Sequence, residues 1–326
     1  MTYLSLFSGI EAASVAWEPV GFRPLAFAET DPFCCSLLSQ RWPEVPNLGD
    51  VREVDFRGYR GRADVVVGGS PCQSFSRAGG GEGLRGKSGL MLEFVRAVAE
   101  ARPRWVVWEN VPGALSVEQG RAFGCLLREL DELGYGLAWR VLDAQAFGVP
   151  QRRRRVYLVG FGHGAGRACE VLLERRPDSR DLLSGAEPGE RAAVGAGDRS
   201  KGGAEPSGPD DVMCFEKSGV TRPDCGANPL WGLPAYTLTA SGERLHVVTG
   251  DYRVRRLTPT ECERLMGFPD GHTLVEHRGR PAADDPRYRA LGNSMAVPVM
   301  RWIGERIAKA DRPGPVTALR RIVRRW

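Results

Sequence analysis

Short apolar runs that end at Gly, Pro or Asp alternate with helical segments through the first half of the chain, and this alternation limits the possible folds most strongly. The strand candidates are residues 3–7, 24–29, 64–68 and 104–109. The helix candidates are residues 89–102 and 121–133, with apolar side chains at helical spacing. This pattern predicts an α/β fold with a mostly parallel sheet covered by helices.

The composition argues against several classes of protein. No stretch approaches the roughly eighteen uninterrupted apolar residues of a membrane span, and the N-terminus lacks a basic start before a signal-like apolar run. We therefore expect a cytoplasmic protein without a membrane partner. The 8 cysteines show no C-x-x-C pair and the 4 histidines no ligand spacing, so we expect reduced thiols and no metal. A net charge of +5 is compatible with a polyanionic partner.

Regular patterning continues with a strand candidate at residues 155–161 and then weakens. Residues 185–211 are rich in Gly, Ala, Pro and charge and predict an exposed, flexible loop. Further on, Thr258 and Glu261 form a capping-box pattern around a proline. They predict a helix that ends at Gly267.

Cys72 lies in the most informative segment, residues 65–76, where an apolar strand runs into a Gly-rich loop that presents a thiol. In α/β proteins, ligands bind beyond the carboxyl ends of the strands, where such a loop lies. A thiol there is a candidate nucleophile if nearby groups favour the thiolate. The alternative is simple packing, which we retain for the other seven cysteines.

Two further segments deliver polar groups in the same way. Residues 105–113 form an apolar strand that ends in Glu109, a candidate acid or hydrogen-bonding partner, although a solvated or helix-capping carboxylate would look the same. Residues 151–155 enter the next strand, and alternation along it sends Arg153 and Arg155 to one face and Arg152 and Arg154 to the other. The side chains on one face can line the site while those on the other contact phosphates. The alternative is a basic patch that attracts nucleic acids in general.

The N-terminal strand leads through Phe7, Ser8 and Gly9 into a helix, an arrangement that holds nucleotide-like ligands against backbone amides. Glu29 ends the second strand, where a carboxylate commonly receives ribose hydroxyls, and Asp50 follows at a third turn. Both acids could instead be simple turn residues.

Taken in order, these segments resemble the hallmark motifs of the bacterial and phage cytosine-5 DNA methyltransferases. The matching motifs are Phe7-Ser8-Gly9, Pro71-Cys72-Gln73, Glu109-Asn110-Val111, Gln151 to Arg155, Arg255 to Pro269 and Leu291-Gly292-Asn293-Ser294-Met295. A short Thr-Leu signature, Thr237-Leu238, also matches. The resemblance covers nearly the whole chain.

The resemblance implies a Rossmann-like, S-adenosylmethionine-dependent methyltransferase fold with a smaller target-recognition domain. Residues 1–161 would form the catalytic and cofactor-binding domain, residues 162–285 the recognition domain, and residues 286–326 a segment that returns to the catalytic domain. We expect a monomer that acts on double-stranded DNA, in a restriction-modification system or in phage or prophage self-protection.

The same matching assigns roles to individual residues. Catalysis would use Cys72, Glu109, Arg153 and Arg155. The cofactor would be bound by Phe7, Gly9, Ile10, Glu29, Asp50, Val51, Pro71, Met91, Asn293 and Ser294. DNA would be contacted by Gln73, Ser74, Ser76, Gln151, Arg152, Arg154 and Thr237. The chain departs from the family at Glu11, where a second glycine is usual; this carboxylate could cap the following helix or alter cofactor contacts.

In the mechanism that the resemblance implies, the Cys72 thiolate adds to carbon 6 of a flipped cytosine and carbon 5 then takes the methyl group. Glu109 and an arginine would stabilise the charge that builds on the ring. Two alternatives remain: a transfer-RNA cytosine-5 methyltransferase on the same fold, and a DNA-binding relative without catalysis. Neither the target sequence nor the base that removes the carbon 5 proton follows from these residues.

Overall fold

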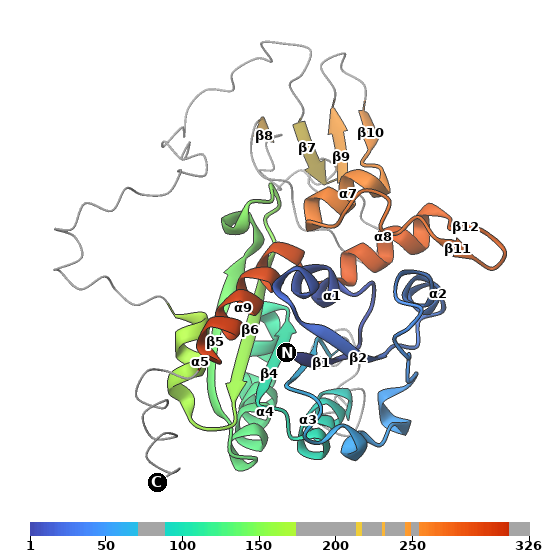
Figure 1. Ribbon diagram of the computed structural model, residues 1–326. Coiled ribbons are helices and arrows are strands. Elements are labelled where there is room, and N and C mark those ends of the chain that lie inside the picture. The colour runs from blue at the N-terminus through green and yellow to red at the C-terminus, as the bar shows by residue number, and fades with distance from the viewer. Residues whose placement is uncertain (71–88, 174–212, 217–229, 232–244, 249–253, 313–326) are drawn as a thin grey trace, which may run out of the picture.

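A six-stranded sheet forms the centre of the protein in a computed structural model that describes residues 1–70, 89–173, 213–216, 230–231, 245–248 and 254–312 (Figure 1). The strand order is β2-β1-β3-β4-β6-β5. The strands are β1 (Thr2–Leu6), β2 (Arg23–Ala28), β3 (Val65–Gly68), β4 (Trp105–Asn110), β5 (Gly136–Asp143) and β6 (Arg154–Phe161). The predicted strands are therefore confirmed, whereas β5 was not predicted.

The sheet is mostly parallel, as expected. Strands β2, β1, β3 and β4 pair in parallel, while β6 runs antiparallel to both of its neighbours, β4 and β5. The reversal matters for the site. It brings the first residues of β6 to the edge where β1, β3 and β4 have their carboxyl ends, because Asn110 at the end of β4 pairs with Val156.

Helices cover both faces of the sheet. The helices are α1 (Ala12–Trp17), α2 (Pro32–Arg41), α3 (Gly89–Ala101), α4 (Arg121–Glu132), α5 (Ala165–Leu172), α7 (Pro259–Met266), α8 (Asp284–Asn293) and α9 (Val297–Ala310). The short 3-10 helices are η1 (Glu18–Val20), η2 (Val51–Glu53), η3 (Phe56–Tyr59), η6 (Pro112–Leu115), η7 (Val117–Gly120) and η8 (Ala144–Phe147). The two helices predicted in the first half, now α3 and α4, are confirmed.

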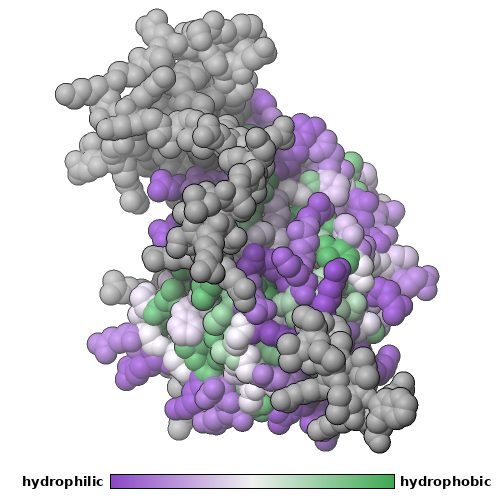
Figure 2. Space-filling model, turned by 60° about the vertical axis from the view of Figure 1, so that its left-hand side comes forward, coloured by the Kyte–Doolittle hydropathy of each residue, from purple (hydrophilic) through white to green (hydrophobic). Residues whose placement is uncertain are grey.

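Two hydrophobic cores follow from the pleat of the strands. Val65 and Val67 face the core that α1, α5 and α9 cover, whereas Val66 faces the core under α3 and α4. Burial on both faces explains why the central strands read as continuous apolar runs. Hydrophilic residues dominate the coloured outer surface, with hydrophobic residues in patches between them (Figure 2). Within the described ranges, no helix is both long and apolar enough to cross a membrane.

Helix α9 returns to the large sheet from the C-terminal part of the chain. It packs against α1 and α5, and the Trp17 indole donates a hydrogen bond of 2.7 Å to the Met300 carbonyl. A Cβ at Gly304 would lie 2.5 Å from the Trp17 ring, so only glycine allows this close approach. The last described helix therefore belongs to the same core as the first.

A smaller antiparallel sheet lies at the top of the molecule beside α7 (Figure 1). Its strands, in the order β10-β9-β7-β8, are β7 (Met213–Glu216), β8 (Leu230–Trp231), β9 (Leu245–Val248) and β10 (Val254–Arg256). Strands β11 (Glu276–His277) and β12 (Arg280–Pro281) form a separate hairpin. The loop predicted at residues 185–211 lies outside the described residues.

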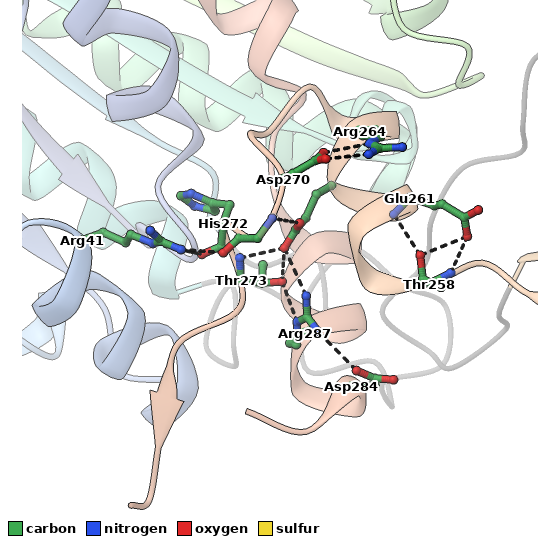
Figure 3. A network of polar contacts seen from close by, with 11 residues as sticks. Arg41, Thr258, Glu261, Arg264, Asp270, His272, Thr273, Asp284 and Arg287 are labelled. Carbon is green, nitrogen blue, oxygen red and sulfur yellow. Dashed lines mark hydrogen bonds and ion pairs between the residues drawn. The ribbon is translucent and has the colours of Figure 1, made fainter. Parts of the chain in front are cut away.

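The capping box predicted for α7 is confirmed. The Thr258 hydroxyl accepts from the Glu261 amide, the Glu261 carboxylate accepts from the Thr258 amide, and Gly267 ends the helix with a φ of 79°. Figure 3 shows this cap beside a second, buried network.

The buried network is centred on Glu263, which is fully buried on α7. Its carboxylate accepts hydrogen bonds of 2.7 Å from the amides of Gly271 and Thr273 and another from the Thr273 hydroxyl. Arg287 of α8 donates to that hydroxyl over 2.9 Å and lies 3.5 Å from Glu263 (Figure 3). The network therefore fixes the loop between α7 and β11.

That loop contacts the N-terminal part of the chain. Arg41 of α2 donates to the carbonyls of Gly271 and His272. The His272 Nε2 atom lies 2.8 Å from the Ile10 carbonyl, in the turn between β1 and α1. Residues about 260 positions apart are thus joined at the carboxyl edge of the large sheet.

Candidate active site

A cavity of about 1020 Å³ opens at the carboxyl edge of the large sheet. Its walls come from the segments after β1, β2, β3 and β4, from the start of β6 and from the end of α8. Ten of the predicted site residues line it: Phe7, Gly9, Glu29, Asp50, Val51, Glu109, Arg153, Arg155, Asn293 and Ser294. The structure therefore gathers cofactor candidates and catalytic candidates around one space.

The turn after β1 has an unusual backbone. Phe7, Gly9 and Glu11 have φ values of 54°, 55° and 60°, a conformation that residues other than glycine rarely adopt and that is typical of functional turns. The Gly9 amide donates to Glu29 over 2.7 Å. The other Glu29 oxygen accepts from the amides of Thr30 and Asp31. Glu29 thus ties the turn after β1 to the turn after β2.

Asp50 lies at the entrance of the third turn and caps η2. Its carboxylate accepts from the Arg52 amide at 3.0 Å and from the Arg52 guanidinium at 2.5 Å. These hydrogen bonds lower the pKa of Asp50 to about 2. Asp50 is therefore an acceptor at the cavity rim throughout the physiological pH range.

Arg96 of α3 supports the third turn from behind. Its guanidinium donates to the carbonyls of Val51 over 2.6 Å and Val54 over 2.9 Å, and it pairs with Glu93 and Glu100 of its own helix. The position of Val51 in the cavity wall therefore depends on α3.

The loop that carries Cys72 is held at its first residue. The Asn110 amide donates to the Ser70 carbonyl over 3.0 Å, and the Trp108 indole donates to the Ser70 hydroxyl over 3.2 Å. A Cβ at Gly69 would lie 3.2 Å from the carbonyl and side-chain oxygens of Glu109, so this close approach favours glycine. Five predicted residues on the loop, Pro71, Cys72, Gln73, Ser74 and Ser76, lie outside the described residues, as does Thr237.

Glu109 is buried at the end of β4, with the Arg155 guanidinium 3.4 Å away. Burial raises the pKa of Glu109, and the positive charges of Arg155 and Arg153 oppose this rise. A carboxyl group in this setting keeps its proton to higher pH than an exposed one. It can therefore donate a hydrogen bond to a ring nitrogen where an ordinary carboxylate could only accept.

The arginines of residues 151–155 alternate as predicted: Arg153 and Arg155 point inward, and Arg152 and Arg154 are exposed. The two inward arginines differ. Arg153 donates to the carbonyls of Gly292 over 3.0 Å and Ser294 over 2.6 Å. Arg155 faces Glu109. The structure thus joins Arg153 to the loop after α8 and places Arg155 beside the buried carboxyl.

Three predicted residues are placed differently from the expectation. Ile10 and Met91 are buried in the two hydrophobic cores and are not among the described residues that line the cavity. Gln151 is fully buried, and its side-chain amide has no hydrogen-bond partner among the described residues. Ile10 and Met91 are apolar, and burial in a core removes more of their surface from water than a position in a polar cavity wall would.

Glu11 does cap α1, as the sequence suggested: its carboxylate accepts from the Ser14 amide over 3.0 Å. It also lines the cavity. The sequence reasoning missed four other charged cavity residues, Asp31, Arg52, Glu93 and Arg289. Arg289 could have been found, because it lies one helical turn before Asn293 on α8.

Among the described residues, no group of three or more His, Cys, Asp or Glu side chains could hold a metal ion. The residues that line the cavity instead offer carboxylates, guanidinium groups, hydroxyls and side-chain amides. These are donors and acceptors for an organic ligand.

Comparison with known proteins identifies a family and individual proteins that are similar to this chain. The family described as C-5 cytosine-specific DNA methylase matches residues 1–183 and 222–309. A crystal structure of a protein described as a DNA modification methyltransferase encoded within an E. coli prophage superposes with a TM-score of 0.65 at 20% identity, over 95% of this chain and 99% of that one. At this identity the likeness concerns the fold.

Two relatives in sequence cover almost the whole chain. The DNA N-6-adenine-methyltransferase of Escherichia phage P1 is 32% identical over 95% of this chain, which spans 61% of the length of that protein. The Type II methyltransferase M2.BsuMI of Bacillus subtilis is 30% identical over 95% of this chain and 76% of its own length. The first name states the methylated position, adenine N-6, whereas the second states only that the enzyme is a Type II methyltransferase.

Proposed function

This chain belongs to the C-5 cytosine-specific DNA methylase family, and on that basis we propose that it transfers a methyl group from S-adenosylmethionine to carbon 5 of cytosine in double-stranded DNA. The observation that carries the proposal is the buried pair of Glu109 and Arg155, 3.4 Å apart, which lines the same cavity as the turn after β1. One end of the cavity suits a nucleoside cofactor and the other a base.

The cavity residues fit S-adenosylmethionine. The cavity volume of about 1020 Å³ is ample for a ligand of this size. The left-handed turn at Phe7 and Gly9 opens backbone groups to the cavity, and Glu29 and Asp50 offer carboxylates at the ends of two neighbouring segments. When bound, the cofactor would supply an electrophilic methyl group. Asn293 and Ser294 would close the pocket from α8.

In the proposed reaction, the Cys72 thiolate forms a bond to carbon 6 of a cytosine that has left the base stack. Burial favours the protonated form of Glu109, which donates to ring nitrogen 3, and Arg155 stabilises the carbonyl oxygen as negative charge develops. Carbon 5 then takes the methyl group, loses its proton to a base, and the bond to Cys72 breaks. Arg153 positions the loop at residues 292–294.

DNA would reach the cavity from the side of the small sheet. We propose that Arg152 and Arg154, which are exposed at the start of β6, contact phosphates, together with Gln73, Ser74, Ser76 and Thr237 near the base. Gln151, being buried, would support this segment from within. The proposed division remains residues 1–161 for catalysis, 162–285 for recognition and 286–326 as the returning segment.

The biological role that we propose is DNA modification, either paired with a restriction endonuclease or in self-protection. The name of the Bacillus subtilis relative, a Type II methyltransferase, supports the first setting. The name of the phage P1 relative refers to adenine N-6. An exocyclic amine needs no thiol addition to become nucleophilic, so Pro71-Cys72-Gln73 favours cytosine carbon 5.

The test is transfer of label from S-adenosylmethionine into mixed-sequence duplex DNA, followed by nucleoside analysis, with Cys72→Ser and a transfer-RNA substrate in parallel. Label in 5-methylcytosine from DNA, absent with Cys72→Ser, is the expected result. Label in N6-methyladenine or only in RNA would overturn the proposal and identify the substrate.

A further inference from the structure

Glu11 is the one point where the cavity departs from the glycine that the family motif usually has, and its surroundings are well defined. Its side chain is 1% exposed. One carboxylate oxygen accepts from the amide and hydroxyl of Ser14, and the other accepts from the Ser5 hydroxyl over 2.7 Å. A φ of 60° at a residue with a Cβ is strained, so something besides the backbone has to favour this side chain.

The position of Glu11 follows from the strand order. Strand β1 lies between β2, which Glu29 follows, and the pair β3 and β4; Ser70 follows β3, and Glu109 lies near the end of β4. A cofactor with its ribose near Glu29 and its methyl group directed toward Glu109 has to place the groups between them above the end of β1. In S-adenosylmethionine the ribose and the methyl group are joined through the sulfonium, which is cationic and also carries the methionine chain with its ammonium.

The charges of the cavity agree with this placement. Glu11, Glu29 and Asp31 line the end formed by the first two turns and have no arginine or lysine partner among the described residues. Farther along the wall, Asp50 pairs with Arg52 and Glu109 with Arg155. The end near β1 and β2 therefore has uncompensated negative charge, which favours a cation.

We propose that the Glu11 carboxylate binds a cationic group of S-adenosylmethionine, the sulfonium or the methionine ammonium, and makes cofactor affinity depend on its own ionisation. This inference rests on the proposed function and names the residue that selects the charged cofactor. In the protein alone, burial raises the pKa of Glu11 to about 7, with hydrogen bonds from Ser5 and Ser14 opposing the rise. A nearby cation favours the ionised form, so binding of the cofactor expels a proton.

Other ionisable groups lie near Glu11. Tyr3 of β1 reaches it through the Ser14 hydroxyl at 2.6 Å, and burial raises the pKa of this phenol far above neutrality. Glu18 of η1 adds a negative charge. His272 contacts the neighbouring Ile10 carbonyl, and burial lowers its pKa. Glu29 and Arg153 line the same cavity.

The experiment is calorimetric titration of the full chain with S-adenosylmethionine from pH 6 to 8, in buffers of different ionisation enthalpy. With a pKa of about 7, wild-type affinity should rise by about tenfold over this range, with proton release near pH 7. Glu11→Gly, suited to a φ of 60°, should lose this rise. Titration of the ligand's own amine is common to both proteins and cancels in the comparison.

Glu11→Gln, which is nearly isosteric, should also lose the rise of affinity with pH. Ser5→Ala should move that rise to higher pH, because it removes a hydrogen bond that stabilises the Glu11 carboxylate. Two further ligands identify the cation. If only S-adenosylmethionine loses affinity in Glu11→Gly, the sulfonium is bound; if S-adenosylhomocysteine loses as much, the ammonium is bound.

Neutral 5′-methylthioadenosine should bind both proteins equally. An equal loss for this ligand, or the same pH dependence in wild type and both Glu11 variants, would overturn the inference while leaving the methyltransferase proposal intact. A wild-type protein that binds no S-adenosylmethionine at any pH would overturn both.

Discussion

Removal of the Arg287 guanidinium tests how the buried network around Glu263 (Figure 3) supports the turn between β1 and α1. Arg287→Met keeps most of the side-chain volume but leaves the Glu263 carboxylate, which is fully buried, without its only described cation. Loss of one partner from a buried pair costs about 3–5 kcal/mol. Two backbone amides and the Thr273 hydroxyl still donate to Glu263, so we expect the lower end, about 3 kcal/mol.

A loss of this size should lower the melting temperature by about 6–12 °C, because each kcal/mol corresponds to roughly 2–4 °C in a protein somewhat smaller than this one. Arg264→Met is the matched control. Arg264 and its partner Asp270 are mostly exposed, although their atoms are only 2.5 Å apart, so this change should leave the melting curve unaltered.

Calorimetry or circular dichroism of the three proteins gives the answer. The network also holds His272 against the Ile10 carbonyl, so Arg287→Met should weaken cofactor binding at temperatures where the protein is still folded. Equal melting temperatures for Arg287→Met and wild type would refute the view that the buried charge pair stabilises this part of the fold.

Three further predictions concern the cavity. Gly69→Ala places a methyl group 3.2 Å from two Glu109 oxygens, so kcat should fall by about tenfold with unchanged folding; an unaltered kcat would show that Glu109 can move without loss. Glu109→Gln should lower kcat by about 10²-fold or more. Because burial raises the pKa of Glu109, wild-type kcat should also fall as pH rises through that pKa, and a Gln variant that keeps this alkaline decline would contradict the assignment. Arg96→Met frees the Val51 and Val54 carbonyls, so the Kd for S-adenosylmethionine should rise by about fivefold in calorimetry while saturated kcat stays the same.

Much of the large sheet followed from the sequence because its strands are buried on both faces. Val65, Val66 and Val67 form an uninterrupted apolar run, and such runs bounded by Gly or Asp are hard to mistake. Strand β5 escaped prediction because it lies at the edge of the sheet. Its residues follow no regular burial pattern, because the adjacent Trp139, 47% exposed, and Arg140 are both exposed. Pairing with β6 decides its conformation, and pairing partners are not visible in a local pattern.

The cavity could be predicted where a residue ends a strand and not where it depends on a distant contact. Glu29 and Glu109 were found because each follows an apolar run. The separate positions of Arg153 and Arg155 could not be predicted, because they depend on the carbonyls of residues 292 and 294 far along the chain. Ile10 was assigned to the cofactor by motif position, and the structure places its side chain in a hydrophobic core, which a motif match does not indicate.

The most direct measurement of the central claim is covalent trapping of Cys72 by DNA that contains 5-fluorocytosine. Fluorine at carbon 5 cannot leave as the proton does, so the bond between the thiol and carbon 6 would persist after methyl transfer. We predict a protein–DNA adduct that requires S-adenosylmethionine and maps by mass spectrometry to the peptide with Cys72. Failure to form the adduct with DNA that the enzyme methylates, or an adduct that persists in Cys72→Ala, would contradict the account.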